Sequence, residues 1–152
     1  MQTKILTYKT NIHAPLDEVF NFFSKAENLN LLTPPHIRFK ILTPLPIAMF
    51  PKQIIKYKIV LFGLPFNWKT EICEWNPPFK FVDRQLTGPY KTWHHQHIFE
   101  ELEGKTVMTD IITYQSKGWI LAPFLHWLFV DRNVKEIFAY REKQLNEIFR
   151  NN

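Results

Sequence analysis

TWHHQHIFEELEGKTVMTDIITYQ, residues 92–115, contains two runs of alternating residues on either side of Glu103-Gly104. Alternation with a period of two is typical of β-strands, and a two-residue loop joins neighbouring antiparallel strands into a hairpin. The stretch therefore predicts a hairpin of strands Thr92–Leu102 and Lys105–Gln115. If Glu103 and Gly104 form its loop, the register pairs Trp93 with Tyr114, His95 with Ile112, His97 with Asp110, and Phe99 with Met108.

Successive residues of a strand point to opposite faces, so these eight side chains share one face. That face is aromatic at its edges and polar in the middle, where His95, His97 and Asp110 lie. Buried polar groups need partners, and a cross-strand pair of His97 with Asp110 supplies them. The carboxylate would also raise the pKa of His97, because it favours the imidazolium form.

Further strands precede the hairpin. Turns rich in glycine, proline and asparagine separate four of them, at Ile37–Leu42, Gln53–Phe62, Asn67–Trp75 and Phe79–Leu86. With the hairpin they make six consecutive strands joined by turns, which is typical of an antiparallel meander. On the last of the four, Asp83 and Gln85 share the face of Phe81 and are expected to point inward.

Helical patterns flank the meander. After a strand at Thr3–Ile12, Pro15 opens a first helix, and Ser24 with Glu27 forms a capping box for a second one at Lys25–Leu32. Apolar residues at helical spacing predict one long helix over residues 121–149. The fold class is therefore α+β, a helix-grip fold. In it, a curved antiparallel sheet of about seven strands, two short helices after the first strand and one long C-terminal helix enclose a cavity.

Composition limits the possible classes of protein. A chain of 152 residues predicts a single domain over residues 1–152, and its one cysteine, Cys73, excludes a disulfide framework. The net charge of +5 is scattered without a run of like charges, so a nucleic-acid partner is not expected. The longest uncharged stretch, Gly118–Val130, is too short for a transmembrane segment, and the N-terminus lacks a secretory signal. We therefore expect a cytoplasmic protein.

One motif is more specific than the element order. It comprises Phe81, Asp83 and Gln85, then Gly88-Pro89, and then Trp93, His95, His97 and Phe99, followed by Asp110 and Tyr114. The chain resembles the START-like (SRPBCC) superfamily, which includes the birch-pollen allergen family and polyketide cyclases, and within it a bacterial ligand-binding subfamily. The resemblance implies a hydrophobic ligand pocket rather than a defined reaction, and it implies no cofactor.

Three interpretations of the polar cluster remain open. It is a satisfied hydrogen-bond network, or it orients a ligand, or it performs acid–base catalysis with His97 as base and Asp110 as its partner. No nucleophile accompanies the histidines, because Cys73 falls on the opposite face of a regular strand. His95, His97 and Asp110 have the spacing of metal ligands, but nothing else in the sequence requires a metal, so none is expected. The candidate ligand-binding residues are Trp68, Phe81, Gln85, Trp93, His95, His97, Phe99, Asp110 and Tyr114.

These features support three functional hypotheses. The first is a non-enzymatic protein that binds or transports a lipophilic small molecule between the sheet and the C-terminal helix. The second is an enzyme of the cyclase, dehydratase or isomerase kind that uses the same pocket. The third is a lipid or quinone chaperone that contacts a membrane through an apolar lip at Trp119–Phe129, with the loop Pro44–Pro51 on the other side of the entrance.

Overall fold

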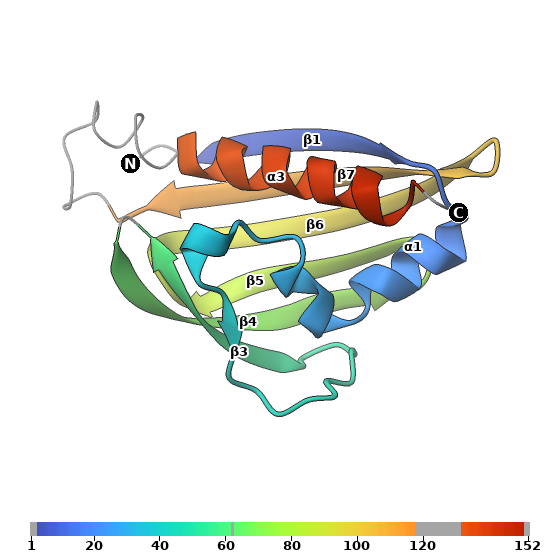
Figure 1. Ribbon diagram of the computed structural model, residues 1–152. Coiled ribbons are helices and arrows are strands. Elements are labelled where there is room, and N and C mark those ends of the chain that lie inside the picture. Colours follow the sequence, from blue (N-terminus) through green and yellow to red (C-terminus); the bar gives the residue numbers. More distant parts are fainter. Residues whose placement is uncertain (1–2, 62, 118–131, 151–152) are drawn as a thin grey trace.

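A computed structural model describes residues 3–61, 63–117 and 132–150. Seven strands form one antiparallel sheet in the order β1-β7-β6-β5-β4-β3-β2, so β1 returns to pair with the last strand (Figure 1). This confirms the predicted meander. The strands are β1 (Lys4–Ile12), β2 (Lys40–Ile41), β3 (Ile54–Leu61), β4 (Leu64–Asn76), β5 (Lys80–Thr87), β6 (Tyr90–Leu102) and β7 (Lys105–Ser116).

The predicted hairpin has the predicted register. Trp93 pairs with Tyr114, His95 with Ile112, and His97 with Asp110. Both loop residues have positive φ, 52° at Glu103 and 75° at Gly104. A type I′ turn requires this conformation at both central positions, and its twist matches that of the two strands. Hairpin and register were therefore determined by the same two residues.

The helices of the described residues lie on one side of the sheet (Figure 1). They are α1 (Leu16–Phe23), the short 3₁₀ helices η1 (Ala26–Asn30) and η2 (Pro35–Ile37), and α3 (Arg132–Ile148). None of the helices in the described part of the chain combines the length and the apolar character needed to cross a membrane. The arrangement is a helix-grip fold, as the sequence predicts.

Two local predictions were wrong. Ser24 does not cap a second α-helix, because its hydroxyl donates to the carbonyl of Phe20 at 2.8 Å and so ends α1. The next segment is only the 3₁₀ helix η1, whose cap residue Lys25 makes no side-chain cap bond. The strand predicted at Ile37–Leu42 shrinks to β2, because Arg38 adopts a left-handed φ of 48° that interrupts the extended backbone.

The C-terminal helix α3 buries one face. Val134, Phe138, Arg141 and Leu145 are its buried residues, at the spacing of one helix stripe. Phe138 stacks on Tyr8 of β1 with ring centroids 4.3 Å apart. Residues 121–131 of the predicted helix, and the proposed lip at Trp119–Phe129, lie outside the described residues.

A β-bulge in β4 divides the inner face of the sheet. Ile72 pairs with Asp83 but Glu74 pairs with Val82, so Cys73 is an extra residue without a partner on β5. Beyond the bulge the alternation is reversed, and Trp75 points inward to pack on Phe20 of α1. The end of the sheet under α1 is therefore filled by aromatic side chains, and the cavity lies toward the other end.

Candidate functional site

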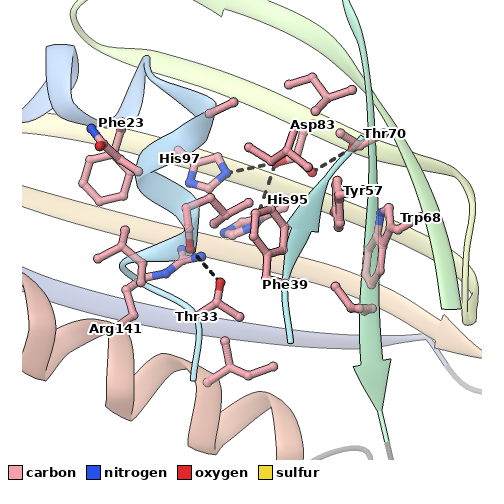
Figure 2. A pocket seen from close by; sticks show the side chains of 18 of the residues that line it. Phe23, Thr33, Phe39, Tyr57, Trp68, Thr70, Asp83, His95, His97 and Arg141 are labelled. Carbon is pink, nitrogen blue, oxygen red and sulfur yellow. Dashed lines mark hydrogen bonds and ion pairs between the residues drawn. The ribbon is translucent and has the colours of Figure 1, made fainter. Parts of the chain in front are cut away.

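A cavity of about 180 Å³ lies between the inner face of the sheet, the segment of η1 and η2, and α3. Most of its lining is apolar or aromatic, and Figure 2 shows Phe39, Tyr57 and Trp68 on one side of it. Met49 lines it from the loop between β2 and β3, while Phe50 of the same loop is exposed. The site is thus a hydrophobic pocket with few polar groups.

The polar groups of the wall come from three neighbouring strands. Asp83 of β5 pairs with His95 of β6, and His97 of β6 pairs with Asp110 of β7. Paired residues of adjacent strands have their side chains on the same face, so all four converge. His95, His97 and Asp110 are buried, and Asp83 is partly buried.

Each histidine lies between the two carboxylates. His97 Nε2 is 2.9 Å from Asp83 Oδ2, and His95 Nε2 is 2.7 Å from Asp110 Oδ1. His97 Nδ1 is 3.0 Å from Asp110 Oδ1, although without the angle of a hydrogen bond. His95 Nδ1 faces Asp83 Oδ2 at 4.0 Å. Both rings are thereby oriented, and the two ring centroids are only 3.8 Å apart.

Arg141 brings a cation from α3 to this cluster. Its Nη1 lies 3.6 Å from Asp110 Oδ1, and its guanidinium carbon lies 4.8 Å from the ring centroid of Phe138. Arg141 is only 7% exposed, and its Nε and Nη1 have no hydrogen-bond partner among the described residues. On the other side, the hydroxyl of Thr70 lies 3.3 Å from Asp83 Oδ1 (Figure 2).

The surroundings shift the pKa values of the two histidines in opposite directions. Burial, and after it the neighbouring His97, lower the pKa of His95 to about 4 against the opposing effect of Asp110. Burial also acts to lower the pKa of His97, but its contacts with Asp110 and Asp83 outweigh burial and raise that pKa. The predicted rise is therefore found for His97 only.

Both carboxyl groups stay ionised. Burial acts to raise the pKa of Asp110 and of Asp83, but the histidines outweigh it and hold both pKa values below the ordinary range. The cluster therefore carries two carboxylates, which are balanced by Arg141 and, below its raised pKa, by His97. His95 is neutral at physiological pH.

The structure places the nine candidate residues in different positions. Five line the cavity, namely Trp68, Phe81, Trp93, His95 and His97. Asp110 lies beneath the histidines and is 1% exposed. The other three are not among the described lining residues: Phe99 packs on Phe20, Tyr114 packs beside Trp93, and the amide of Gln85 bonds both backbone groups of Tyr90.

Sequence reasoning assigned no role in the wall to Arg141 and Thr70, nor to Lys25, Asn28 and Thr33 of the segment before β2. Arg141 occupies an apolar position of the α3 stripe, and a charge at such a position is a signal that could have identified it. Thr70 alternates with Trp68 and Ile72 on the inner face of β4, but a threonine at such a position is common in strands and gives no signal. Asp83 was expected inside, although not as a binding residue.

Solved structures share this fold over nearly the whole chain. The aromatase/cyclase Zhui from Streptomyces sp. R1128 matches with a TM-score of 0.76 and 14% identity, covering 95% of this chain and 92% of that one. A START superfamily protein from Mycobacterium smegmatis matches with 0.71 and 10%, covering 95% and 98%. Ms6760, from the same organism, matches with 0.69 and 18%, covering 97% and 96%. Such low identities show the fold alone.

The sequence itself gives a more direct assignment. No curated protein matches the chain. The model of one family, described as polyketide cyclase / dehydrase and lipid transport, matches residues 12–146, which span β2 to β7, the cavity wall and most of α3. The match agrees with the START-like resemblance of the motif around His95 and His97. The chain therefore belongs to the polyketide cyclase / dehydrase and lipid transport family.

Proposed function

We propose that the protein binds a small lipophilic molecule in the cavity and directs an acceptor oxygen of that molecule toward Arg141. The family assignment supports binding of lipophilic ligands at the level of the family. The observation that carries the finer proposal is the buried guanidinium of Arg141 in a mostly apolar wall, because its Nε and Nη1 have no hydrogen-bond partner among the described residues.

The volume of the cavity limits the size of the ligand. Pockets for drug-sized molecules measure about 300–1,000 Å³. A dry apolar cavity of about 150 Å³ accepts benzene. At about 180 Å³, the cavity fits a compact molecule of about one ring, and a larger ligand requires movement of its wall.

The unpartnered groups define the polar end of the ligand. Besides Arg141, the indole Nε1 of Trp68 is buried without a hydrogen-bond partner among the described residues. Both groups only donate, and a buried donor without an acceptor costs about 1–3 kcal/mol. His95 and His97, in contrast, already contact Asp83 and Asp110. A ligand oxygen that accepts from Arg141 or Trp68 therefore removes a cost that the empty cavity carries.

A matched pair of probes tests this proposal. Acetophenone carries a carbonyl oxygen, and ethylbenzene has a similar size without an acceptor. We expect calorimetric titration to show that both probes bind and that acetophenone binds about tenfold more tightly, since a hydrogen bond to a charged group is worth about 1.5–3 kcal/mol. Arg141→Met should remove this preference, and Lys143→Met on the exposed side of α3 should keep it.

Equal affinity of the wild type for both probes would overturn the role of Arg141, and failure of both probes to bind would overturn the cavity as a ligand site. Trp68→Phe deletes the indole donor without removing a charge, so it serves where Arg141→Met lowers the thermal stability. The catalytic alternative stays a prediction. The membrane lip also stays a prediction, because it lies outside the described residues.

A further inference from the structure

We propose that Asp83, His95 and His97 bind a divalent first-row transition-metal ion on the wall of the cavity. From the sequence we expected no metal site, and the donor set considered there had Asp110 as the third ligand beside the two histidines. The structure replaces that third donor by Asp83, which leaves Asp110 free for a different task. The proposal does not depend on the lipophilic ligand.

One atom from each residue faces a common point. His97 Nε2 and His95 Nδ1 lie 2.9 Å and 4.0 Å from Asp83 Oδ2, and the three donor atoms all lie within 4.8 Å of one another. Metal bonds of about 2.0–2.2 Å in tetrahedral geometry separate neighbouring donors by about 3.3–3.6 Å. Side-chain rotations that shift the donor atoms by a few tenths of an ångström to about one ångström therefore bring them to coordinating distances.

The chemistry of the donors selects the class of ion. Two imidazoles and one carboxylate suit zinc and the other late first-row metals, whereas calcium and magnesium prefer oxygen donors alone. Because all three residues line the cavity, the remaining coordination position faces its interior. An ion held there can bind water or an oxygen of a cavity ligand.

Asp110 provides the support that such sites usually have. Metal-binding histidines almost always donate their second ring nitrogen to a carboxylate or carbonyl, which fixes the ring and the tautomer. Here the second nitrogen of His95, Nε2, hydrogen-bonds with Asp110 Oδ1 at 2.7 Å, and Nδ1 of His97 lies 3.0 Å from the same oxygen without the angle of a hydrogen bond. One buried carboxylate therefore orients both rings with their other nitrogens toward Asp83.

Phe81 and Arg141 complete the surroundings of the three donors. The ring of Phe81 stacks on His97 with centroids 4.1 Å apart, which limits rotation of that imidazole. Arg141 lies on the side of Asp110, 3.6 Å from its Oδ1. A dication at the donors would thus face the carboxylate of Asp83 directly, and Asp110 would separate it from the guanidinium.

Cobalt(II) is the probe for this site, because its visible absorption reports coordination directly. Tag-free protein in a Cys73→Ser background is titrated with Co²⁺, and Zn²⁺ then competes for it, since Cys73 is an exposed thiol that could bind either ion. We expect one equivalent to bind and zinc to displace it. Asp83→Asn should weaken binding at least tenfold, and Asp110→Asn about 10–100-fold, as for other supporting carboxylates.

His94→Ala is the matched control, because His94 alternates with His95 on the outer face of β6 and should leave the affinity unchanged. A second measurement needs no variant at the site. In the wild type, bound Co²⁺ should shift the ring signals of His95 and His97 in nuclear magnetic resonance spectra far more than those of His13, His36 and His94.

The proposal is overturned if millimolar Co²⁺ gives no absorption band, or if it shifts the ring signals of other histidines only. Equal affinities of the wild type and a folded Asp83→Asn variant would overturn it as well. Binding of ethylbenzene and acetophenone in the presence of a chelator is measured on the same samples. A protein that binds these probes but fails to bind Co²⁺ refutes the metal site and leaves the proposed function standing.

Discussion

The histidine pair shows how position changes the properties of one residue type. His95 and His97 lie two residues apart on the same face of β6, yet the pKa of His95 falls to about 4 and that of His97 rises. The difference comes from contacts, because His97 meets both Asp83 and Asp110 at 3.0 Å or less, whereas His95 meets only Asp110 that closely. No local sequence pattern encodes this asymmetry, since it depends on three strands at once.

The stability of the metal-free protein should therefore depend on pH. A folded pKa of about 4 for His95, against about 6.5 in the unfolded chain, means that acid favours unfolding between those two values. From pH 7 to pH 5, this effect lowers the free energy of unfolding by about 2 kcal/mol. Urea denaturation with a chelator should show this loss in the wild type, and His95→Gln should lose about 2 kcal/mol less.

The other titrating groups act in different ranges of pH. The raised pKa of His97 adds stability that is complete below about pH 6.5 and is lost as the pH rises through the folded value. The lowered pKa values of Asp83 and Asp110 add stability above about pH 4 that is lost in stronger acid. His94→Gln is the control, and an identical pH dependence of the wild type and His95→Gln would contradict the assignment to His95.

At the scale of elements, the predictions succeeded where one local rule decides the structure. Glu103-Gly104 determined the β6–β7 hairpin, its register, and with it the faces of His95, His97 and Asp110. The predictions failed where two local rules compete. Ser24 can cap a following helix or end the preceding one, and the bond of its hydroxyl to Phe20 shows that it does the latter.

One substitution in the hairpin loop should raise the free energy of unfolding. Glu103 has a φ of 52°, a left-handed conformation that asparagine adopts more easily than glutamate. We expect Glu103→Asn to raise the free energy of unfolding by about 0.5–1 kcal/mol, measured by urea denaturation. Glu101→Asn is the control, since Glu101 lies within β6, where asparagine is unfavourable. A loss of stability in Glu103→Asn would show that the glutamate side chain has a role of its own.

At the scale of the whole molecule, the inner face of the sheet has a filled end and a hollow end. Under α1, rings of Phe20, Trp75, Phe81 and Phe99 contact one another with centroids about 5–6 Å apart. Toward η2 and α3, the same sheet lines the cavity. The sequence predicted a cavity from the order of elements, but it could not say which aromatic residues fill space and which line it, because both kinds alternate in the same way along a strand.

A larger side chain at the hollow end of the sheet should weaken ligand binding while the protein still folds. Ile59 of β3 is 5% exposed and lines the cavity. Ile59→Phe adds a ring's width to that wall, so we expect at least a tenfold loss of ethylbenzene affinity with a change in stability of about 1–3 kcal/mol or less. Ile5→Phe, on the outer face of β1 where Ile5 is 65% exposed, should bind as the wild type does. Unchanged affinity of a folded Ile59→Phe variant would place the probe elsewhere.

The extra residue in β4 has a consequence for how the sequence of this protein can change. Cys73 shifts the phase of the strand, so Thr70 and Ile72 before it and Trp75 after it all point inward. The side chain of Cys73 is exposed, so most substitutions at this position should be silent. Removal of the residue would join Ile72 to Glu74 in a regular alternation and would leave Trp75 pointing inward, opposite Phe81. Both the identity of residue 73 and its presence can therefore change without exposing Trp75.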